Sequence, residues 1–446
     1  MKKRINDIMI AGFALFAMFL GAGNMIFPPT LGANAGTSWL ASLLGFLITG
    51  VGFPVLGVIS MTLSKGEVEE FTKNLSPWFS TLLISTILLI IGPLFAIPRT
   101  AATTYEIGVH PFLTGMLNEN ALNIAGIVAR LVFFIATFIF VLNPGKVIDT
   151  IGKFLTPILI IVLALVIGKG IFAPLGTPAP VEDRNFFLIG FRGGYQTMDA
   201  LGSILLAIIV IESLIARGYK GRKTLFSMTA IIGLIACIGL ALVYTGLAYL
   251  GASSSGLLAE SMDKTDRLVK IVDLLWGRWG KTILGLSISF ACLTTSVGLT
   301  TIGGEYFSKK LKLPYKPVVA IITIISFFIS IVGVEGIILF AGPILEIVYP
   351  VVIALIFINF FARFLPNCWF TRGAIIGTLL VSLSLGVTYL RGFINTVFKT
   401  SLDFTATRAF LDKLPLAGIG LSWIVPAIVL GIICGVIAMF TKSCKK

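Results

Sequence analysis

The sequence predicts an all-helical integral membrane protein with twelve transmembrane helices, and three observations lead to this prediction. Of the 446 residues, 57% are hydrophobic and only 12% are charged, whereas soluble domains are about one-quarter charged. The mean hydropathy is +1.02. The chain also divides into long apolar segments, and two of these, the first and the sixth, are interrupted by glycines and polar residues.

The apolar segments follow one another along the whole chain. A helix needs about 20 mostly apolar residues to cross the hydrocarbon core of a bilayer. The candidates lie at 7–32, 36–64, 77–106, 122–143, 146–171, 193–216, 224–251, 281–306, 317–334, 337–362, 370–391 and 418–441. Several are longer than one crossing requires, which is typical of helices that tilt, break or continue into water.

The charged residues set the predicted topology. The formal net charge is +14, and most of the excess lies in short loops between apolar segments. We therefore attribute it to membrane orientation, with both termini in the cytoplasm, and not to nucleic-acid binding. The five cysteines form no metal-ligand spacing, and the single histidine, His110, argues against a histidine-based metal site or proton relay.

Two of the outer loops have helical apolar spacing. They are LVKIVDLLWGRW at 268–279 and ATRAFLDKL at 406–414, and we expect both to be partly ordered. The motif WGRWGKT at 276–282 has two residues between its glycines, where a phosphate-binding loop needs four. We interpret its Trp and Lys residues as anchors at the membrane interface.

The first apolar segment contains the stretch FLGAGNMIFPP at 19–29, with two glycines, an asparagine and two prolines. In hydrocarbon, each unpaired backbone group costs several kcal/mol, so a break persists only where protein, water or a ligand satisfies those groups. The alternative is a glycine packing face between helices. Gly21 and Gly23 are two residues apart, which does not place them on one helical face. We therefore expect a binding site at this break.

The sixth segment opens in a similar way, with GGYQTMDALGS at 193–203. Its polar residues include Gln196, Thr197 and Asp199. Spans one and six are five helices apart, so they cross the membrane in opposite directions, as an inverted repeat requires. Two breaks at matching places predict two inverted halves with a shared central site.

The eighth segment carries a third polar cluster, SISFACLTTSVGLTT at 287–301. The hydroxyls of Thr294 and Thr295, together with main-chain carbonyls, suit a small hard cation such as Na⁺. The alternative is that Ser and Thr hydroxyls bond back to the carbonyl four residues earlier. We adopt that alternative for Thr300 and Thr301, and the cation for Thr294 and Thr295.

Three motifs together give the sequence a family resemblance. They are GFALFAMFLGAGNMIFPPTLG at 12–32, GPLFAIPRTAATTYEIGVHP at 92–111 and GYQTMDALGS at 194–203. The sequence resembles the branched-chain amino acid:cation symporter family, bacterial carriers of leucine, isoleucine and valine. The match spans essentially the whole chain, including its length and its number of helices.

The resemblance implies the five-plus-five inverted-repeat fold of the bacterial leucine transporter, in which helices 1 and 6 are discontinuous. Residues 1–173 would form the first five-helix repeat, residues 174–363 the second, and residues 364–446 two additional transmembrane helices. The protein would be a carrier and not an enzyme, embedded in the bacterial cell membrane.

The resemblance also implies roles for individual residues. The GxGN pattern of that fold matches Gly21 to Asn24, and the AxLT[ST] pattern of its eighth helix matches Ala291 to Thr295. The implied substrate site comprises Phe19, Ala22, Gly23, Asn24, Gln196, Thr197 and Asp199, with the N–H groups of Ala22 and Gly23 holding the carboxylate and the carbonyls of Phe19, Gln196 and Thr197 receiving the ammonium. The implied sodium site comprises Ala17, Leu20, Ala291, Thr294 and Thr295.

The sequence departs from the leucine-transporter pattern at span seven, 224–251, which has no asparagine for a second sodium site. We therefore expect one Na⁺ per cycle. Asp199 would bind the substrate ammonium, hold a cation, carry a proton or cap its half-helix. Arg99 and Glu106 lie two turns apart on one face, where an internal ion pair and an outer gate are both open interpretations. Glu346 is a weaker candidate for proton coupling.

These observations predict Na⁺-coupled symport of branched-chain amino acids by alternating access, and they leave the ranking among leucine, isoleucine and valine open. A proton-coupled amino acid symporter of the same fold is the nearest alternative. An ion channel is a more distant one, because the sequence has no repeated filter and no ring of like charge. A membrane enzyme is not expected, since no HExxH, GxSxG or Cys/His constellation is present.

Overall fold

The computed structural model describes residues 2–440 except 65, 143, 183, 260, 363, 366 and 399–402. The predicted segment limits at residues 143 and 441, and the predicted repeat boundary at residue 363, therefore lie outside the described residues. Within the described ranges every extended regular element is a helix. Eight helical segments of this part of the chain are long and apolar enough to cross a membrane, and shorter apolar helices lie at Pro157–Phe172, Tyr315–Ser330 and Ile424–Phe440.

Most helices of the first half correspond to predicted spans. They are α1 Lys2–Phe19, α2 Ala22–Ala35, α3 Trp39–Leu47, α4 Phe53–Leu63, α5 Val68–Phe71, α6 Pro77–Leu89, α7 Ala96–Gly108, α8 His110–Leu113, α9 Glu119–Val141 and α10 Pro144–Phe172. A 3₁₀ turn, Gly36–Ser38, follows α2. A π-helical turn, Ile48–Gly52, joins α3 to α4.

The helices of the second half are longer on average. They are α11 Phe186–Tyr195, α12 Asp199–Ala216, α13 Arg222–Ser253, α14 Lys264–Leu311, α15 Tyr315–Ser330, α16 Gly333–Phe360, α17 Cys368–Phe398, α18 Thr405–Asp412 and α19 Ile424–Phe440. A 3₁₀ turn, Ala417–Ile419, precedes α19.

The first predicted span is two helices in the structure. Helix α1 ends at Phe19 and α2 begins at Ala22, and Gly21 between them is extended, with φ −90° and ψ −176°. Both prolines of the quoted stretch lie inside α2 and not at the interruption. Proline cannot donate to the carbonyl four residues earlier, so Pro28 and Pro29 weaken the turn that follows the interruption.

The third predicted span is also divided, which the sequence analysis missed. A π-helical segment, Ile90–Leu94, separates α6 from α7, and Gly92 inside it is non-helical, with φ −93° and ψ −122°. Pro93 follows directly and contributes no N–H to the ladder. A kink at a Gly-Pro pair has an identifiable local cause, and here it sets the direction in which α7 enters the centre of the molecule.

Both predicted outer-loop helices are present. Residues 268–279 lie in α14, which changes direction at Gly277, where φ is +61°. A positive φ of this size is readily adopted only by glycine, so the parts of α14 before and after Gly277 meet at a defined angle. Residues 406–412 lie in α18.

Helix α2 packs against α13 with their backbones in contact. A Cβ added to Gly32 would lie 1.9 Å from the carbonyl oxygen of Ala248, and a Cβ added to Gly251 would lie 1.9 Å from that of Pro29. Because neither position has room for a methyl group, the two helices approach as closely as glycine allows.

Helix α1 packs against the same helix through side chains. A Cβ on Gly12 would lie 2.8 Å from Cγ2 of Ile235, and one on Gly239 would lie 2.8 Å from a ring carbon of Phe16. Both halves of the first predicted span therefore contact α13, but the nature of the contact differs between them.

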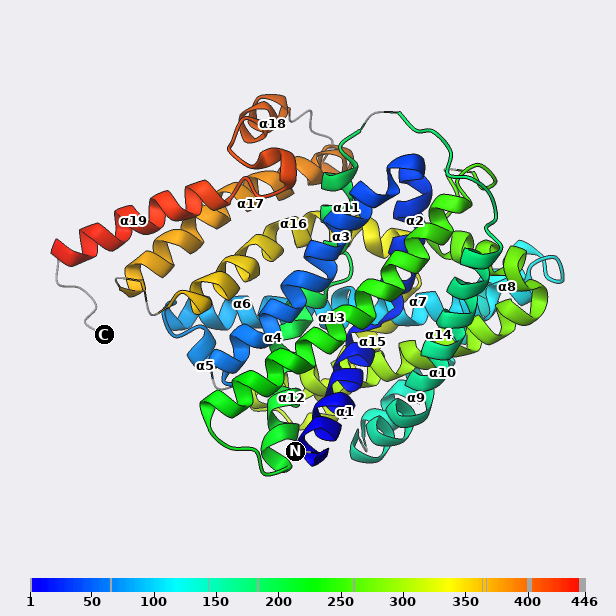
Figure 1. The fold of residues 1–446 in the computed structure, drawn as a ribbon, viewed down its shortest axis with the longest axis horizontal. Coiled ribbons are helices and arrows are strands. Elements are labelled where there is room, and N and C mark those ends of the chain that lie inside the picture. Colours follow the sequence, from blue (N-terminus) through cyan, green and yellow to red (C-terminus); the bar gives the residue numbers. More distant parts are fainter. Residues whose placement is uncertain are drawn as a thin grey trace.

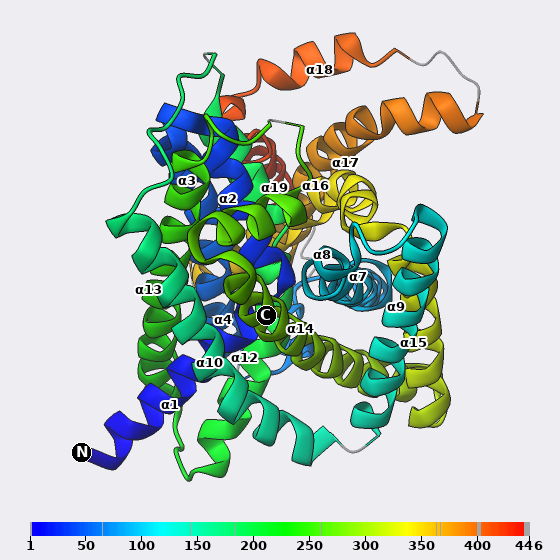
Figure 2. The ribbon, with the colours of Figure 1, turned by 90° about the vertical axis from the view of Figure 1, so that its right-hand side faces the viewer.

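The remaining helices surround this central group. In Figure 1, α17 and α19 lie together at the side away from α2 and α8, and they pack on each other and, through α17, on α16. In Figure 2, α9 and α15 lie side by side at one edge, and α7 passes inside them toward α2. Helix α2, which follows the first predicted break, is buried along most of its length.

Candidate functional site

The two helix interruptions meet at Asn24, in the first turn of α2. Its Nδ2 donates a hydrogen bond of 2.5 Å to Oδ2 of Asp199, the first residue of α12. It also donates to the hydroxyl of Tyr244 on α13. The three residues are 2%, 8% and 0% exposed. One amide group, with its two N–H donors, therefore joins both interruptions and the seventh predicted span.

The backbone at the first interruption has both N–H groups and carbonyl groups without a hydrogen-bond partner among the described residues. Leu20 N donates to Phe16 O at 3.0 Å, and Gly21 N turns back to Phe19 O at 2.7 Å. Among the described residues, the N–H groups of Ala22 and Gly23 and the carbonyls of Ala17 and Leu20 have no hydrogen-bond partner. In a protein interior such groups call for a ligand, because leaving them unpaired is costly.

The second interruption lies between Tyr195, which ends α11, and Asp199. Met198 between them is left-handed, with φ +63°, a conformation that costs a non-glycine residue about 1–2 kcal/mol. The Thr197 hydroxyl donates to Gly194 O at 2.9 Å and accepts from Asp199 N at 3.3 Å. This side chain therefore braces the break, and only its carbonyl is free to act as a ligand.

Asp199 does not cap the helix that it begins. The N-cap position of α12 is Met198, and the Asp199 carboxylate bonds to Asn24 instead. The interpretation of Asp199 as a helix cap is therefore wrong. A capping carboxylate must precede the first helical residue to reach the free N–H groups, and Asp199 lies one residue too late.

Arg99 of α7 reaches into the space between the two interruptions. Its Nη1 donates to the carbonyl of Gln196 at 2.6 Å. A Cβ placed on Gly23 would lie 2.5 Å from Nη2, and the guanidinium carbon lies 5.7 Å from the ring centroid of Phe27. The side chain is only 3% exposed. The predicted Gln196 carbonyl is thus engaged by a cation of the protein itself.

Arg99 does not pair with Glu106, so the internal ion pair, one of the two open interpretations, is wrong. Glu106 accepts from Val334 N and from the Thr265 hydroxyl, each at 2.9 Å, and so ties α7 to α16 and α14. Seven residues place two side chains on one helical face but about 10 Å apart along the axis. That separation exceeds the reach of a direct ion pair, and each group bonds to a different neighbour.

The two threonines of α14 bond back to their own helix. Thr294 Oγ1 donates to Phe290 O and Thr295 Oγ1 donates to Ala291 O, each at 3.0 Å. A Cβ placed on Gly21 would lie 3.8 Å from Thr295 Oγ1. The structure therefore brings Thr295 beside the first interruption. Hydroxyl oxygens that donate to a carbonyl keep lone pairs for another partner.

Aromatic residues at the site were missed by the sequence analysis. Tyr244 is edge-on to Phe46 of α3, with centroids 5.3 Å apart, and Tyr349 of α16 stacks on Tyr195 at 4.3 Å. A tyrosine in the middle of an apolar segment is a usable signal, since its hydroxyl requires a polar partner when buried. Tyr244 carries that signal in span seven, within α13.

Glu346 is paired outside this cluster. Its Oε1 lies 3.3 Å from Nε of Arg192 on α11. The guanidinium carbon of Arg192 in turn lies 5.1 Å from the ring centroid of Tyr389 on α17. Glu346 therefore links α16 to α11 beside the second interruption.

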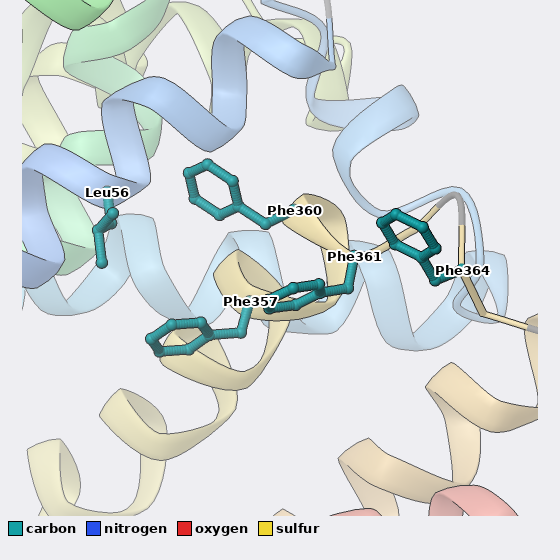
Figure 3. A pocket seen from close by; sticks show the side chains of 5 residues that line it. All are labelled: Leu56, Phe357, Phe360, Phe361 and Phe364. Carbon is teal, nitrogen blue, oxygen red and sulfur yellow. The ribbon is translucent and has the colours of Figure 1, made fainter.

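A cavity of about 310 Å³ lies elsewhere, between α4 and the end of α16. It is lined by Leu56, Phe357, Phe360, Phe361 and Phe364, whose side chains are shown in Figure 3. This lining is wholly apolar, so it offers no group to hold a charged or polar ligand in place. The candidate site is the buried cluster at the two interruptions, because charged and polar groups converge there.

Comparison with known proteins places the chain in a family. The model of a family described as "Branched-chain amino acid transport protein" matches residues 4–441. The chain belongs to this family. The branched-chain amino acid permease BraB of Bacillus subtilis is 39% identical over 99% of this chain and 98% of its own length. The branched-chain amino acid transport system 2 carrier protein of Pseudomonas aeruginosa is 36% identical, over 96% of each chain.

Family membership confirms the resemblance inferred from the three motifs, and it confirms that the protein is a transporter and not an enzyme. Together with the apolar helices, it also shows a multi-pass membrane protein.

Solved structures show the fold. Mhp1, a nucleobase-cation-symport-1 family transporter, in a closed conformation with bromovinylhydantoin bound, superimposes with a TM-score of 0.59 at 12% identity, covering 97% of this chain and 92% of Mhp1. A mutant of the manganese transporter of Eremococcus coleocola gives the same TM-score at 12% identity, covering 95% and 94% of the two chains. The predicted all-helical, leucine-transporter-type fold is therefore confirmed.

Proposed function

We propose that this protein is a secondary active symporter that imports leucine, isoleucine and valine together with Na⁺ by alternating access. The observation that carries the proposal is the contact of two helix interruptions through Asn24 and Asp199, in a chain of this family. In transporters of inverted-repeat design, substrate and coupling ion bind where two discontinuous helices expose backbone groups.

The proposal includes the finer topology predicted above. Helices α1 and α2 are the halves of a discontinuous first span, and α11 and α12 those of the sixth, in a bacterial cell membrane with both termini in the cytoplasm. The twelve spans are α1 with α2, α3 with α4, α6 with α7, α9, α10, α11 with α12, α13, the part of α14 after Gly277, α15, α16, α17 and α19.

The substrate carboxylate binds the free N–H groups of Ala22 and Gly23, because a helix N-terminus carries a partial positive charge that attracts anions. The ammonium binds Asp199 and the carbonyls of Phe19 and Thr197. The Gln196 carbonyl accepts from Arg99, so it joins the ammonium ligands only if that side chain moves. Asn24 orients Asp199 from the other side.

Size selection follows from the apolar residues around these groups. Met198 and Leu201 are buried beside the second break, with 3% and 0% exposure. Each buried CH₂ of a substrate contributes about 0.8 kcal/mol, so the site favours leucine over alanine by about 2 kcal/mol. The names of the relatives, which are permeases and carriers for branched-chain amino acids, support the same substrate class.

A single Na⁺ binds between the first interruption and α14. Its ligands are the carbonyls of Ala17, Leu20 and Ala291 and the hydroxyls of Thr294 and Thr295. The unpartnered carbonyls of α1 and the position of Thr295 beside Gly21 support this assignment. Bound Na⁺ organises the same backbone that holds the substrate, which couples the two binding events.

Proton coupling is the second candidate, and one observation favours it. Asp199 is a buried carboxylate whose hydrogen-bond partner is the neutral Asn24 amide. Buried ionisable groups in membrane transporters often serve as proton carriers. In this version a proton on Asp199 replaces the sodium ion.

The test is uptake of radiolabelled leucine by proteoliposomes that contain the purified protein, at fixed pH, with and without an inward Na⁺ gradient. We expect saturable accumulation that requires Na⁺, a raised Na⁺ requirement in Thr294→Ala, and no transport in Asp199→Ala. Accumulation driven by a pH gradient in the absence of Na⁺ would replace Na⁺ by H⁺ in the proposal. No saturable uptake of leucine, isoleucine or valine would refute it altogether.

A further inference from the structure

We propose that Arg99 is the counter-ion of the substrate carboxylate, so that Arg99 and Asp199 recognise the two charged ends of a zwitterionic amino acid. The proposal rests on the proposed function and deepens it, because it assigns the charged head group of the substrate to two side chains. Backbone groups then complete the binding of each end and do not carry it alone.

The first argument is the unused hydrogen-bonding capacity of Arg99. A guanidinium has five N–H donors, and the structure gives this one a single acceptor, Gln196 O. Its Nε is buried and has no partner among the described residues. Donors left unpaired in a buried cation are costly. A carboxylate that enters the site would satisfy two of them at once.

The second argument is the position of the guanidinium. It lies against Gly23, where a Cβ would come within 2.5 Å of Nη2 and 2.8 Å of Cζ. The N–H groups of Ala22 and Gly23 are also free. A positive side chain therefore lies beside a helix N-terminus, which is itself partly positive, and no anion of the described residues separates them. An anion bound there is attracted by both.

The third argument is the opposite charge across the site. The Asp199 carboxylate bonds to Asn24, and Arg99 bonds to Gln196, so the two charges are not directly paired. Asp199 begins α12, and the guanidinium of Arg99, a residue of α7, lies beside Gly23 in the first turn of α2. A zwitterion has its carboxylate and ammonium on one carbon atom, and this arrangement offers each group a partner of opposite sign, so that the charges of Arg99, Asp199 and the substrate cancel.

A purely structural role is the competing explanation. In that case Arg99 serves only to hold the Gln196 carbonyl and the second interruption in place. Loss of Arg99 would then weaken every ligand equally, because the damage would not concern the carboxylate. The two explanations differ in the selectivity between ligands, and not in overall affinity.

The experiment measures binding of L-leucine and of L-leucinamide, which keeps the ammonium and side chain but lacks the carboxylate charge. Purified full-length protein in nanodiscs is titrated with each ligand by calorimetry at saturating Na⁺. We expect the wild type to prefer leucine, and Arg99→Gln to reduce the ratio of the two affinities by roughly 10- to 100-fold. The control is Arg130→Gln, which removes another buried arginine, stacked on Tyr105 of α7, and leaves the ratio unchanged.

Equal weakening of both ligands in Arg99→Gln, or an unchanged ratio, would overturn the proposal, as would a wild type without preference for leucine. If Arg99→Gln fails to fold, Arg99→Lys provides the same measurement. Lysine keeps the charge but cannot form two parallel bonds, so we expect a smaller fall in the ratio, and no fall would count against the proposal. A wild type that binds no branched-chain amino acid would instead contradict the proposed function.

Discussion

Gly23→Ala uses one methyl group to test the position of the Arg99 guanidinium against the first turn of α2. Gly23 lies in α2, where its backbone is helical and its φ is not in the left-handed region. The new Cβ would lie 2.5 Å from Nη2 of Arg99 and 2.8 Å from Cζ. Real Cβ contacts are longer than this, so the guanidinium must move. When it moves, the 2.6 Å bond from Arg99 to Gln196 O is lost.

Two opposing terms set the size of the effect. A hydrogen bond from a charged group contributes about 1.5–3 kcal/mol, and alanine is favoured over glycine in a helix by about 1 kcal/mol. Gly23→Ala should therefore change the free energy of unfolding by no more than about 2 kcal/mol. Because the displaced guanidinium no longer faces the substrate carboxylate, substrate binding weakens. We expect the half-saturating leucine concentration to rise about 10- to 100-fold.

The assay is leucine uptake in proteoliposomes together with thermal unfolding of the same preparations. Gly202→Ala, in the first turns of α12, is the matched control, because a Cβ there has no atom within 4 Å. It should transport as the wild type does. Wild-type half-saturation in Gly23→Ala would refute the position assigned to Arg99, and unfolding of that variant would show that the methyl group disturbs the backbone instead.

Three further outcomes follow from single contacts. Tyr244→Phe removes the hydroxyl that accepts from Asn24 and should raise the half-saturating leucine concentration about fivefold, for a hydrogen bond of about 1 kcal/mol, as measured by uptake. Gly32→Ala places a Cβ 1.9 Å from Ala248 O and should destabilise the protein by about 1–3 kcal/mol or more, as seen in its thermal unfolding. Thr295→Ala should raise the Na⁺ concentration for half-maximal uptake, and unchanged Na⁺ dependence would remove Thr295 from the ion site.

The sequence predicted the interruptions because their cause is local. Glycine and polar residues in an apolar segment conflict with helix formation in lipid, and the conflict is visible without coordinates. The structure places the first interruption at Leu20 and Gly21 and the second between Tyr195 and Asp199. The break at Gly92 had the same kind of signal, a Gly-Pro pair. The Gly-Pro pair alone did not predict a break there, because the apolar residues directly before it, at 87–91, form an uninterrupted run.

The partners of the charged residues could not be predicted in the same way. Arg99 and Glu106 share a helical face, and sequence spacing alone suggested that they pair. Their actual partners, Gln196 O for Arg99 and Val334 N for Glu106, lie 97 and 228 residues away along the chain. Such contacts depend on how separate helices pack, which local periodicity does not contain. Tyr244 did carry a local signal, a tyrosine within an apolar segment, but its partner Asn24 lies 220 residues away along the chain.

The contacts of α13 with the two halves of the first span differ, and this difference has a consequence for how the two halves can move. Helix α2 packs on α13 at Gly32 and Gly251, where main chain meets main chain and no side chain lies between them. Helix α1 rests on the same partner through Phe16 and Ile235, whose side chains can rotate. If the proposed alternating access bends the first span at Leu20 and Gly21, we therefore expect α1, and not α2, to move relative to α13.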